Sequence, residues 1–121
     1  MEPESQPEGP SGGGEGVIEH LRLHVPAHSQ RAWIEAETHT WEPWLRQRQG
    51  FVGRELRWDQ ERQEGVLLIH WASRTDWKAI PEEMVNAIQA DFESAAKRIL
   101  GLPPESPNPF PLLFSGERSE G

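Results

Sequence analysis

Hydrophobic and polar residues alternate between residues 17 and 25, and this period of two predicts a strand with one apolar and one polar face. A second alternating stretch follows at residues 52–58. The polar run 59–65, which ends in glycine, then indicates a hairpin loop. Residues 66–72 are nearly all apolar, which is typical of a central strand covered on both faces.

Helical spacing of apolar residues begins after the first strand. Between residues 27 and 49 we expect a helix whose apolar stripe consists of Ile34, Trp41 and Leu45. Pro43 removes an internal hydrogen-bond donor, so this helix should kink or restart near Thr40.

A second helical region follows the hairpin. Ser73 with Asp76 forms a capping pattern for a short helix that reaches residue 80. A longer helix over residues 81–100 carries the clearest amphipathic stripe, and Gly101 should end it. After a proline-rich linker, residues 110–115 predict a last short strand.

This order of elements predicts an α+β, ferredoxin-like βαββαβ fold, with a four-stranded antiparallel sheet and two helices on one face. The other face would then be bare. His20, Arg22 and His24 share one side of the first strand. They either line a pocket between the sheet and the helices or lie on the far face, where a second subunit would cover them.

The 121 residues suffice for one domain, which we place at residues 17–115. Residues 1–16 are predicted to be a disordered acidic Gly/Pro tail, and residues 116–121 a mobile tail. The net charge of −8 gives no basic footprint for nucleic acid, and no apolar run is long enough for a membrane span. Without cysteine or a secretory signal pattern, we expect a cytoplasmic protein.

Two motifs resemble a known superfamily. The sequence GFVGRE at residues 50–55 and the sequence VLLIHWASR at residues 66–74 resemble the dimeric α/β-barrel superfamily of antibiotic biosynthesis monooxygenases. Within it, the chain is most similar to a small, uncharacterised family of cyanobacterial proteins. The resemblance covers residues 17–100 and implies a homodimer whose two sheets face each other. It also implies a ligand cavity between each sheet and its helices.

The haem-degrading members of that superfamily carry a tryptophan at the position of Trp71, an asparagine on the first strand and a histidine on the second helix. Trp71 matches, the asparagine position falls near His20, and residues 81–100 contain no histidine. We therefore expect no cofactor. No carboxylate lies at a recognisable ligand spacing from the histidines, so we expect no metal either.

The candidate site residues follow from this resemblance and from the residue types. His20 or His70 would handle a proton, and Trp71 would form a cavity wall. The alternative interpretation of His20 and its strand neighbours is a polar dimer interface or a partly solvated strand, and that of His70 is a hydrogen-bonded core histidine. Four further residues are expected to line the cavity, namely Arg22, His24, Trp41 and Trp58.

The predicted function is that of a small homodimer with a Trp-lined hydrophobic cavity. Such a protein would oxidise or rearrange an aromatic small molecule without a cofactor. One alternative is a non-catalytic ligand-binding or regulatory module of the same fold, and a second is a haem-binding protein. Fold analogy carries most of this functional inference.

Overall fold

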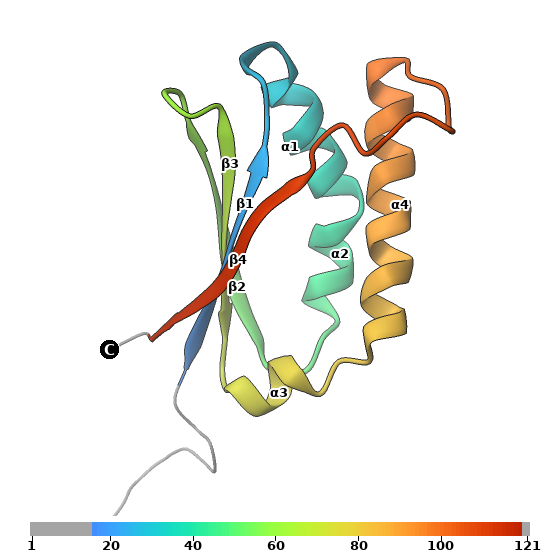
Figure 1. Cartoon of the computed structure of the whole chain (residues 1–121). Coiled ribbons are helices and arrows are strands. Elements are labelled where there is room, and N and C mark those ends of the chain that lie inside the picture. Colours follow the sequence, from blue (N-terminus) through green and yellow to red (C-terminus); the bar gives the residue numbers. More distant parts are fainter. Residues whose placement is uncertain (1–15, 120–121) are drawn as a thin grey trace, which may run out of the picture.

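The computed structural model describes residues 16–119, which form one antiparallel sheet with the helices packed on one of its faces (Figure 1). The strand order is β2-β3-β1-β4, which confirms the predicted ferredoxin-like fold. A short 3-10 turn precedes the first helix. The elements are β1 (Val17–His24), α1 (Gln30–His39), α2 (Trp41–Arg46), β2 (Phe51–Asp59), β3 (Glu64–Trp71), α3 (Arg74–Lys78), α4 (Glu82–Leu100) and β4 (Leu112–Ser119).

The two central strands, β1 and β3, set which residues face the helices. Val17 pairs with Trp71, and Leu21 pairs with Leu67. Directly paired residues lie on the same face of a sheet, and successive residues lie on opposite faces. The odd-numbered residues of β1 and β3 therefore face the helices, and the even-numbered ones, beginning with Ile18, face away.

The first helical region is interrupted at Thr40, as Pro43 predicts. Helix α1 ends at His39 and α2 begins at Trp41, while the Thr40 hydroxyl donates a 2.7 Å hydrogen bond to the carbonyl of Ala36. The predicted apolar stripe was wrong in α1, whose buried residues are Trp33, Ala36 and Glu37. Ile34 is 40% exposed, whereas Trp33 is fully buried.

The interior divides into two hydrophobic clusters. One surrounds Trp33, Phe92 and Phe110, between α1, α4 and the part of the sheet that contains Leu23 and Leu67. The other surrounds Trp71 and Leu45, between β3 and α2. Leu21 and Trp41 border both clusters, and the site described below lies where the two meet.

The predicted cap of α3 and the predicted end of α4 are confirmed, whereas α3 ends at Lys78 and not at residue 80. The Ser73 hydroxyl accepts a 3.1 Å hydrogen bond from the Asp76 amide at the start of α3. Gly101 ends α4 in the left-handed conformation, with φ of 72°. Within residues 16–119, no helix combines the length and apolar character needed to cross a membrane.

The last strand is longer than the sequence predicts. Its strand pairing extends to Ser119, which lies opposite Val17, so residues 116–119 belong to β4 rather than to a mobile tail. The polar composition of this segment hid a strand because backbone pairing with β1 needs no apolar side chain. Of the predicted N-terminal tail, only Gly16 falls within the described residues.

Strand β2 contains an irregularity that the alternation did not predict. Phe51 pairs with Trp71, but the next pair is Gly53 with His70, so Val52 is an extra residue on this strand. Val52 is 66% exposed, although Leu56 and Trp58 pack against the core. The bulge reverses the phase of the strand and turns Arg54 toward the helices.

The glycine assigned to the end of the hairpin loop has a different role. Gly65 lies within β3, and the left-handed conformation of the hairpin falls to Gln63, with φ of 52°. A Cβ atom on Gly65 would lie 2.6 Å from Cζ2 of Trp33. Strand β3 therefore needs a glycine here so that the buried indole can lie directly on the backbone.

This contact yields a stability prediction. Gly65→Ala should lower the free energy of unfolding by about 1–3 kcal/mol, because the added methyl group overpacks a rigid indole. Gly53→Ala, in the neighbouring strand, is the matched control, since no heavy atom lies within 4 Å of its Cβ position. Urea unfolding of both variants measures the difference, and equal stabilities would contradict the proposed packing.

Candidate functional site

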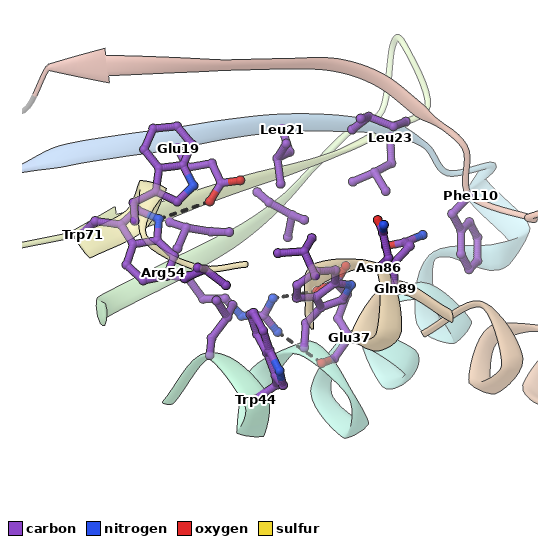
Figure 2. A pocket seen from close by; sticks show the side chains of 18 of the residues that line it. Glu19, Leu21, Leu23, Glu37, Trp44, Arg54, Trp71, Asn86, Gln89 and Phe110 are labelled. Atoms are coloured by element: carbon purple, nitrogen blue, oxygen red, sulfur yellow. Dashed lines mark hydrogen bonds and ion pairs between the residues drawn. The ribbon is translucent and has the colours of Figure 1, made fainter. Parts of the chain in front are cut away.

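A cavity of about 480 Å³ lies between the sheet and the helix layer, where the two hydrophobic clusters meet (Figure 2). The central strands form one wall, α1 and α2 form the opposite wall, and α3 and α4 close two sides. Apolar side chains dominate the lining, with a few charged and amide groups among them. The lining residues are Glu19, Leu21, Leu23, Glu37, Trp41, Trp44, Leu45, Arg54, Leu67, Ile69, Trp71, Trp77, Lys78, Ile80, Val85, Asn86, Gln89, Phe110 and Leu112.

Four of the lining residues are tryptophans, and their orientations are fixed by neighbours. The rings of Trp41 and Trp44 are perpendicular, with centroids 5.4 Å apart. Trp71 is 1% exposed and meets the Phe51 ring edge-on at 6.0 Å. Lys78 lies 4.0 Å from the centroid of the fourth indole, Trp77. Indoles held in this way offer flat, rigid walls to a bound molecule.

A buried ion-pair network joins the sheet to the helix layer at this cavity. Arg54 of β2 donates 2.6 Å hydrogen bonds to Oε1 of Glu37 on α1 and to Oε1 of Glu42 on α2. The side chains of Arg54 and Glu37 are only 3% and 1% exposed. The guanidinium also donates to the backbone carbonyl of Glu37, at 3.3 Å. One cation therefore links three elements.

The two carboxylates of this network differ in their electrostatics. Burial raises the pKa of Glu37, and the charge of Arg54 offsets part of that effect. Burial acts in the same direction on Glu42, but the hydrogen bonds and charges of Arg54 and Arg46 outweigh it and lower the pKa of Glu42. Oε2 of Glu37 is buried without a well-aligned hydrogen-bond partner among the described residues, although the indole of Trp33 lies beside it.

A second carboxylate enters the cavity from the sheet. Glu19 of β1 accepts a 3.1 Å hydrogen bond at Oε1 from the indole nitrogen of Trp71, as Figure 2 shows. Burial raises the pKa of Glu19, while the Trp71 hydrogen bond and the nearby charge of Lys78 act in the opposite direction. The cross-strand neighbour of Glu19 is Glu117, whose carboxylate pairs with Arg74 at 3.2 Å.

The sequence-predicted tryptophans lie in different places. Trp71 and Trp41 both line the cavity. Trp58, predicted to line it, is not among its lining residues. Its indole nitrogen instead donates a 3.0 Å hydrogen bond to the carbonyl of Val25, which anchors β2 to the end of the first strand. Arg54 and Trp58 share the helix-facing side of β2, and of the two only Arg54 lines the cavity.

Three polar residues of β1 lie on the opposite face of the sheet, so their predicted places at the cavity are corrected. His20, Arg22 and His24 alternate with the cavity-lining residues, and the strand period of two therefore directs them away from the helices. His20 packs edge-on against Phe114 of β4, with ring centroids 5.1 Å apart. Arg22 donates a 3.0 Å hydrogen bond to Glu64 of β3.

His70 also lies on the face that is turned away from the helices, because it directly precedes Trp71 on a regular strand. Its Nε2 lies 3.1 Å from Oε2 of Glu55 on β2. The sequence predicts these opposite orientations of His70 and Trp71, and the structure confirms them. His20, His70 and Trp71 consequently do not converge on one cavity.

Sequence reasoning missed Glu19, Glu37 and Arg54, which are the charged residues deepest in the site. A signal for Glu19 was present, because it interrupts the apolar phase of the first strand. The resemblance implies that the first-strand asparagine of that superfamily corresponds to a position near His20. In the structure, the β1 side chain that contacts the Trp71 indole is that of Glu19. Arg54 carries a similar signal, because it interrupts the apolar phase that Val52, Leu56 and Trp58 define on the second strand.

Two observations on the described residues concern metal and haem. Within residues 16–119, no group of three or more histidine and carboxylate side chains is arranged to hold a metal ion. The cavity lining includes no histidine, so a haem placed there would lack the usual imidazole ligand.

Comparisons with known proteins identify the fold. No family model matches the chain, and no curated protein matches it. Its fold resembles a monooxygenase from the ActVA-Orf6 gene of Streptomyces coelicolor, determined with the ligand nanaomycin D. The TM-score is 0.62 at 16% identity, and the match covers 88% of each chain.

Two further structures extend this likeness. A candidate antibiotic biosynthesis monooxygenase of Bordetella bronchiseptica has a TM-score of 0.57 at 13% identity, covering 88% of this chain and 98% of that one. A candidate monooxygenase of Shewanella loihica PV-4 has a TM-score of 0.51 at 16% identity, covering 86% and 92%. The chain thus has the fold of antibiotic-biosynthesis-monooxygenase-like proteins, and at these identities the likeness concerns the fold alone.

The raised pKa of Glu19 predicts a pH-dependent stability. Ionisation of Glu19 disfavours the folded state as the pH rises from the ordinary value of 4.5 through the raised folded value. Glu19→Gln removes this penalty and keeps an acceptor for Trp71. The variant should therefore melt a few degrees above the wild type at neutral pH, with the difference shrinking below pH 4.5.

Melting curves between pH 4 and pH 8 check this expectation. Glu35→Gln is the control, because it removes one charge from an exposed position of α1. A Glu19→Gln variant that melts below the wild type at neutral pH would contradict the prediction. That result would mean that Trp71 and Lys78 favour the carboxylate more than burial disfavours it.

Proposed function

We propose that this protein is a homodimer in which each cavity binds a flat, largely apolar aromatic molecule and promotes its oxidation or rearrangement without a cofactor. The observation that supports this most is the cavity itself. It combines a volume suited to a small molecule with four indole walls and few polar groups. Its fold neighbours include the Streptomyces coelicolor monooxygenase, whose structure contains nanaomycin D.

The proposed reaction requires few catalytic groups from the protein. Dioxygen is the oxidant, an electron-rich aromatic substrate supplies the electrons, and the protein orients the substrate and removes a proton. His20 and His70 lie on the other face of the sheet, so Glu19 is the better-placed acceptor. Arg54 also lines the cavity wall, with its charge paired to Glu37 and Glu42. A cytoplasmic location and kinship with a cyanobacterial family remain predictions from the sequence.

Ligand binding tests the cavity directly. We expect 2-methoxynaphthalene, a flat probe without a hydrogen-bond donor, to quench tryptophan fluorescence and to give a binding isotherm by calorimetry. Trp71→Leu should weaken this binding at least severalfold, because it removes one indole wall. Trp58→Leu also removes an indole, but from outside the cavity, and should leave the affinity near that of the wild type.

A failure of 2-methoxynaphthalene to bind the wild type would contradict the proposal. Equal losses in Trp71→Leu and Trp58→Leu would also contradict it, because binding would then not depend on the cavity wall. Circular dichroism of both variants ensures that each remains folded.

Turnover separates an enzyme from a binding module of the same fold. Oxygen uptake with 1-naphthol in the presence of a metal chelator, at catalytic amounts of protein, is expected for the enzyme. Binding without oxygen uptake across a series of electron-rich naphthols would favour the non-catalytic alternative. Added haem should give no absorption change typical of histidine ligation, since no histidine lines the cavity.

The homodimer is supported by the sheet face that the helices leave open. Figure 1 shows all helices on the other face. Two apolar residues of the open face are Leu68 on β3, which is only 6% exposed, and Phe114 on the edge strand β4, which is 47% exposed. Charged groups, including the pair of Glu55 with Arg57, lie toward the β2 edge. The central strands also place His20, Arg22 and His70 on this face, so it mixes apolar and polar groups, as protein interfaces generally do.

Sedimentation at micromolar concentration should give about twice the chain mass of 13.8 kDa. Phe114→Glu should shift the protein toward the monomer, because it places a charge on the open face. Ile34→Glu is the matched control, since this exposed hydrophobic residue lies on α1, away from that face. A wild-type monomer, or a dimer indifferent to Phe114→Glu, would contradict the proposed arrangement.

A further inference from the structure

We infer that Glu19 is the residue that recognises the ligand in the cavity, by accepting a hydrogen bond at Oε2 from a hydroxyl group on a flat aromatic molecule, and that Trp71 positions this carboxylate. The inference rests on the proposed function and deepens it. It adds a specific binding group and the chemical class of its partner to a cavity defined so far by its walls.

The geometry of the carboxylate carries the inference. Oε1 of Glu19 is committed to the indole nitrogen of Trp71 at 3.1 Å, which fixes the plane of the carboxylate against a fully buried wall. Within residues 16–119, Oε2 has no hydrogen-bond partner, and it is not sealed from solvent. A carboxylate that lines an apolar cavity with one oxygen unused is a strong acceptor for a ligand donor.

The other carboxylate of the cavity does not compete for this role. Glu37 is bound through Oε1 and through its backbone carbonyl to Arg54, and its Oε2 is closed off from solvent. A ligand would have to displace part of the core to reach it. Glu19 is therefore the carboxylate that a ligand can contact.

The charges around Glu19 favour a neutral donor over a cation. Lys78 of α3 already supplies a positive charge near Glu19, and its position over Trp77 places that charge at the cavity. Arg74, also of α3, neutralises the cross-strand neighbour Glu117. A second cation in the cavity would meet Lys78 and would lose its own hydration among indoles. A neutral hydroxyl donor has neither cost.

Paired probes test this inference. 2-Naphthol and 2-methoxynaphthalene differ by a methyl group that caps the donor. We expect wild-type protein at pH 8 to bind 2-naphthol about tenfold more tightly, as a hydrogen bond to a charged acceptor allows. This preference should fall as the pH drops through the titration of Glu19, because a protonated carboxyl is a weaker acceptor. Calorimetry across the pH range measures both affinities.

Two variants test whether Glu19 and Trp71 cause the preference for 2-naphthol. Glu19→Gln should reduce the preference to about twofold or less and remove its pH dependence, while 2-methoxynaphthalene binds as before. Trp71→Phe keeps an aromatic wall but loses the donor to Glu19. It should move the midpoint of the pH dependence upward, because the indole hydrogen bond favours the ionised carboxylate. Glu35→Gln, at an exposed position, should change neither quantity.

The outcomes separate this inference from the proposed function. If both probes bind but Glu19→Gln keeps the full preference for 2-naphthol, Glu19 is not the acceptor and the cavity proposal stands. Tighter binding of 2-naphthylmethylammonium than of 2-naphthol would also overturn the inference, in favour of a cationic ligand. If neither neutral probe binds the wild type, the proposed function fails and the inference fails with it.

Discussion

The buried contact of Arg54 with Glu37 and Glu42 is the interaction on which the arrangement of the two layers depends. It joins β2 to α1 and α2 with charged hydrogen bonds of 2.6 Å, in a place where the side chains of Arg54 and Glu37 are almost fully shielded from water. Loss of one partner from such a network costs about 3–5 kcal/mol, because the remaining charge is left buried. The contact therefore fixes both the position of the helix layer and one wall of the cavity.

Because successive strand residues point to opposite faces, the titratable side chains of the sheet are divided between its two faces. Glu19 and Trp71 face the cavity, whereas His20 and His70 face the open side. The histidines thus lie on the open face of the sheet, and under the proposed function a carboxylate would accept the proton in the cavity. Burial and the charges of Arg22 and Arg118 lower the pKa of His20, so an uncharged imidazole is favoured on that face.

Much of the fold was predictable because it depends on local periodicity and on caps. The order of elements, the break at Thr40, the Ser73 cap and the Gly101 stop all follow from residues close together in sequence. The errors have a common cause in contacts between distant residues. Gly65 is required by Trp33, which lies 32 positions earlier, and strand pairing with Val17 orders residues as far as Ser119.

The candidate site was less predictable than the fold, because its polar residues are defined by orientation rather than by motif. Trp71 and Trp41 were found, since large aromatic residues on buried elements line most cavities of this kind. Arg54 stands in the same alternating phase as Leu56 and Trp58, but that phase does not show that Glu37, a residue 17 positions earlier, is its partner. His20 and His70 were predicted as site residues because histidine can transfer protons near neutral pH. Their positions on β1 and β3 instead place both side chains on the open face of the sheet.

Glu19 and Glu37, the two carboxylates that line the cavity, differ in their contribution to the fold. Both carry a pKa raised by burial, which means that each lowers the stability of the fold when it ionises. The cost at Glu37 is offset by its bonds to Arg54, which organise the helix layer. Glu19 holds only the Trp71 indole by a hydrogen bond and organises no other element within the described residues. Residues that lower stability and do not organise the fold are expected at functional sites. Glu19 fits this description and Glu37 does not.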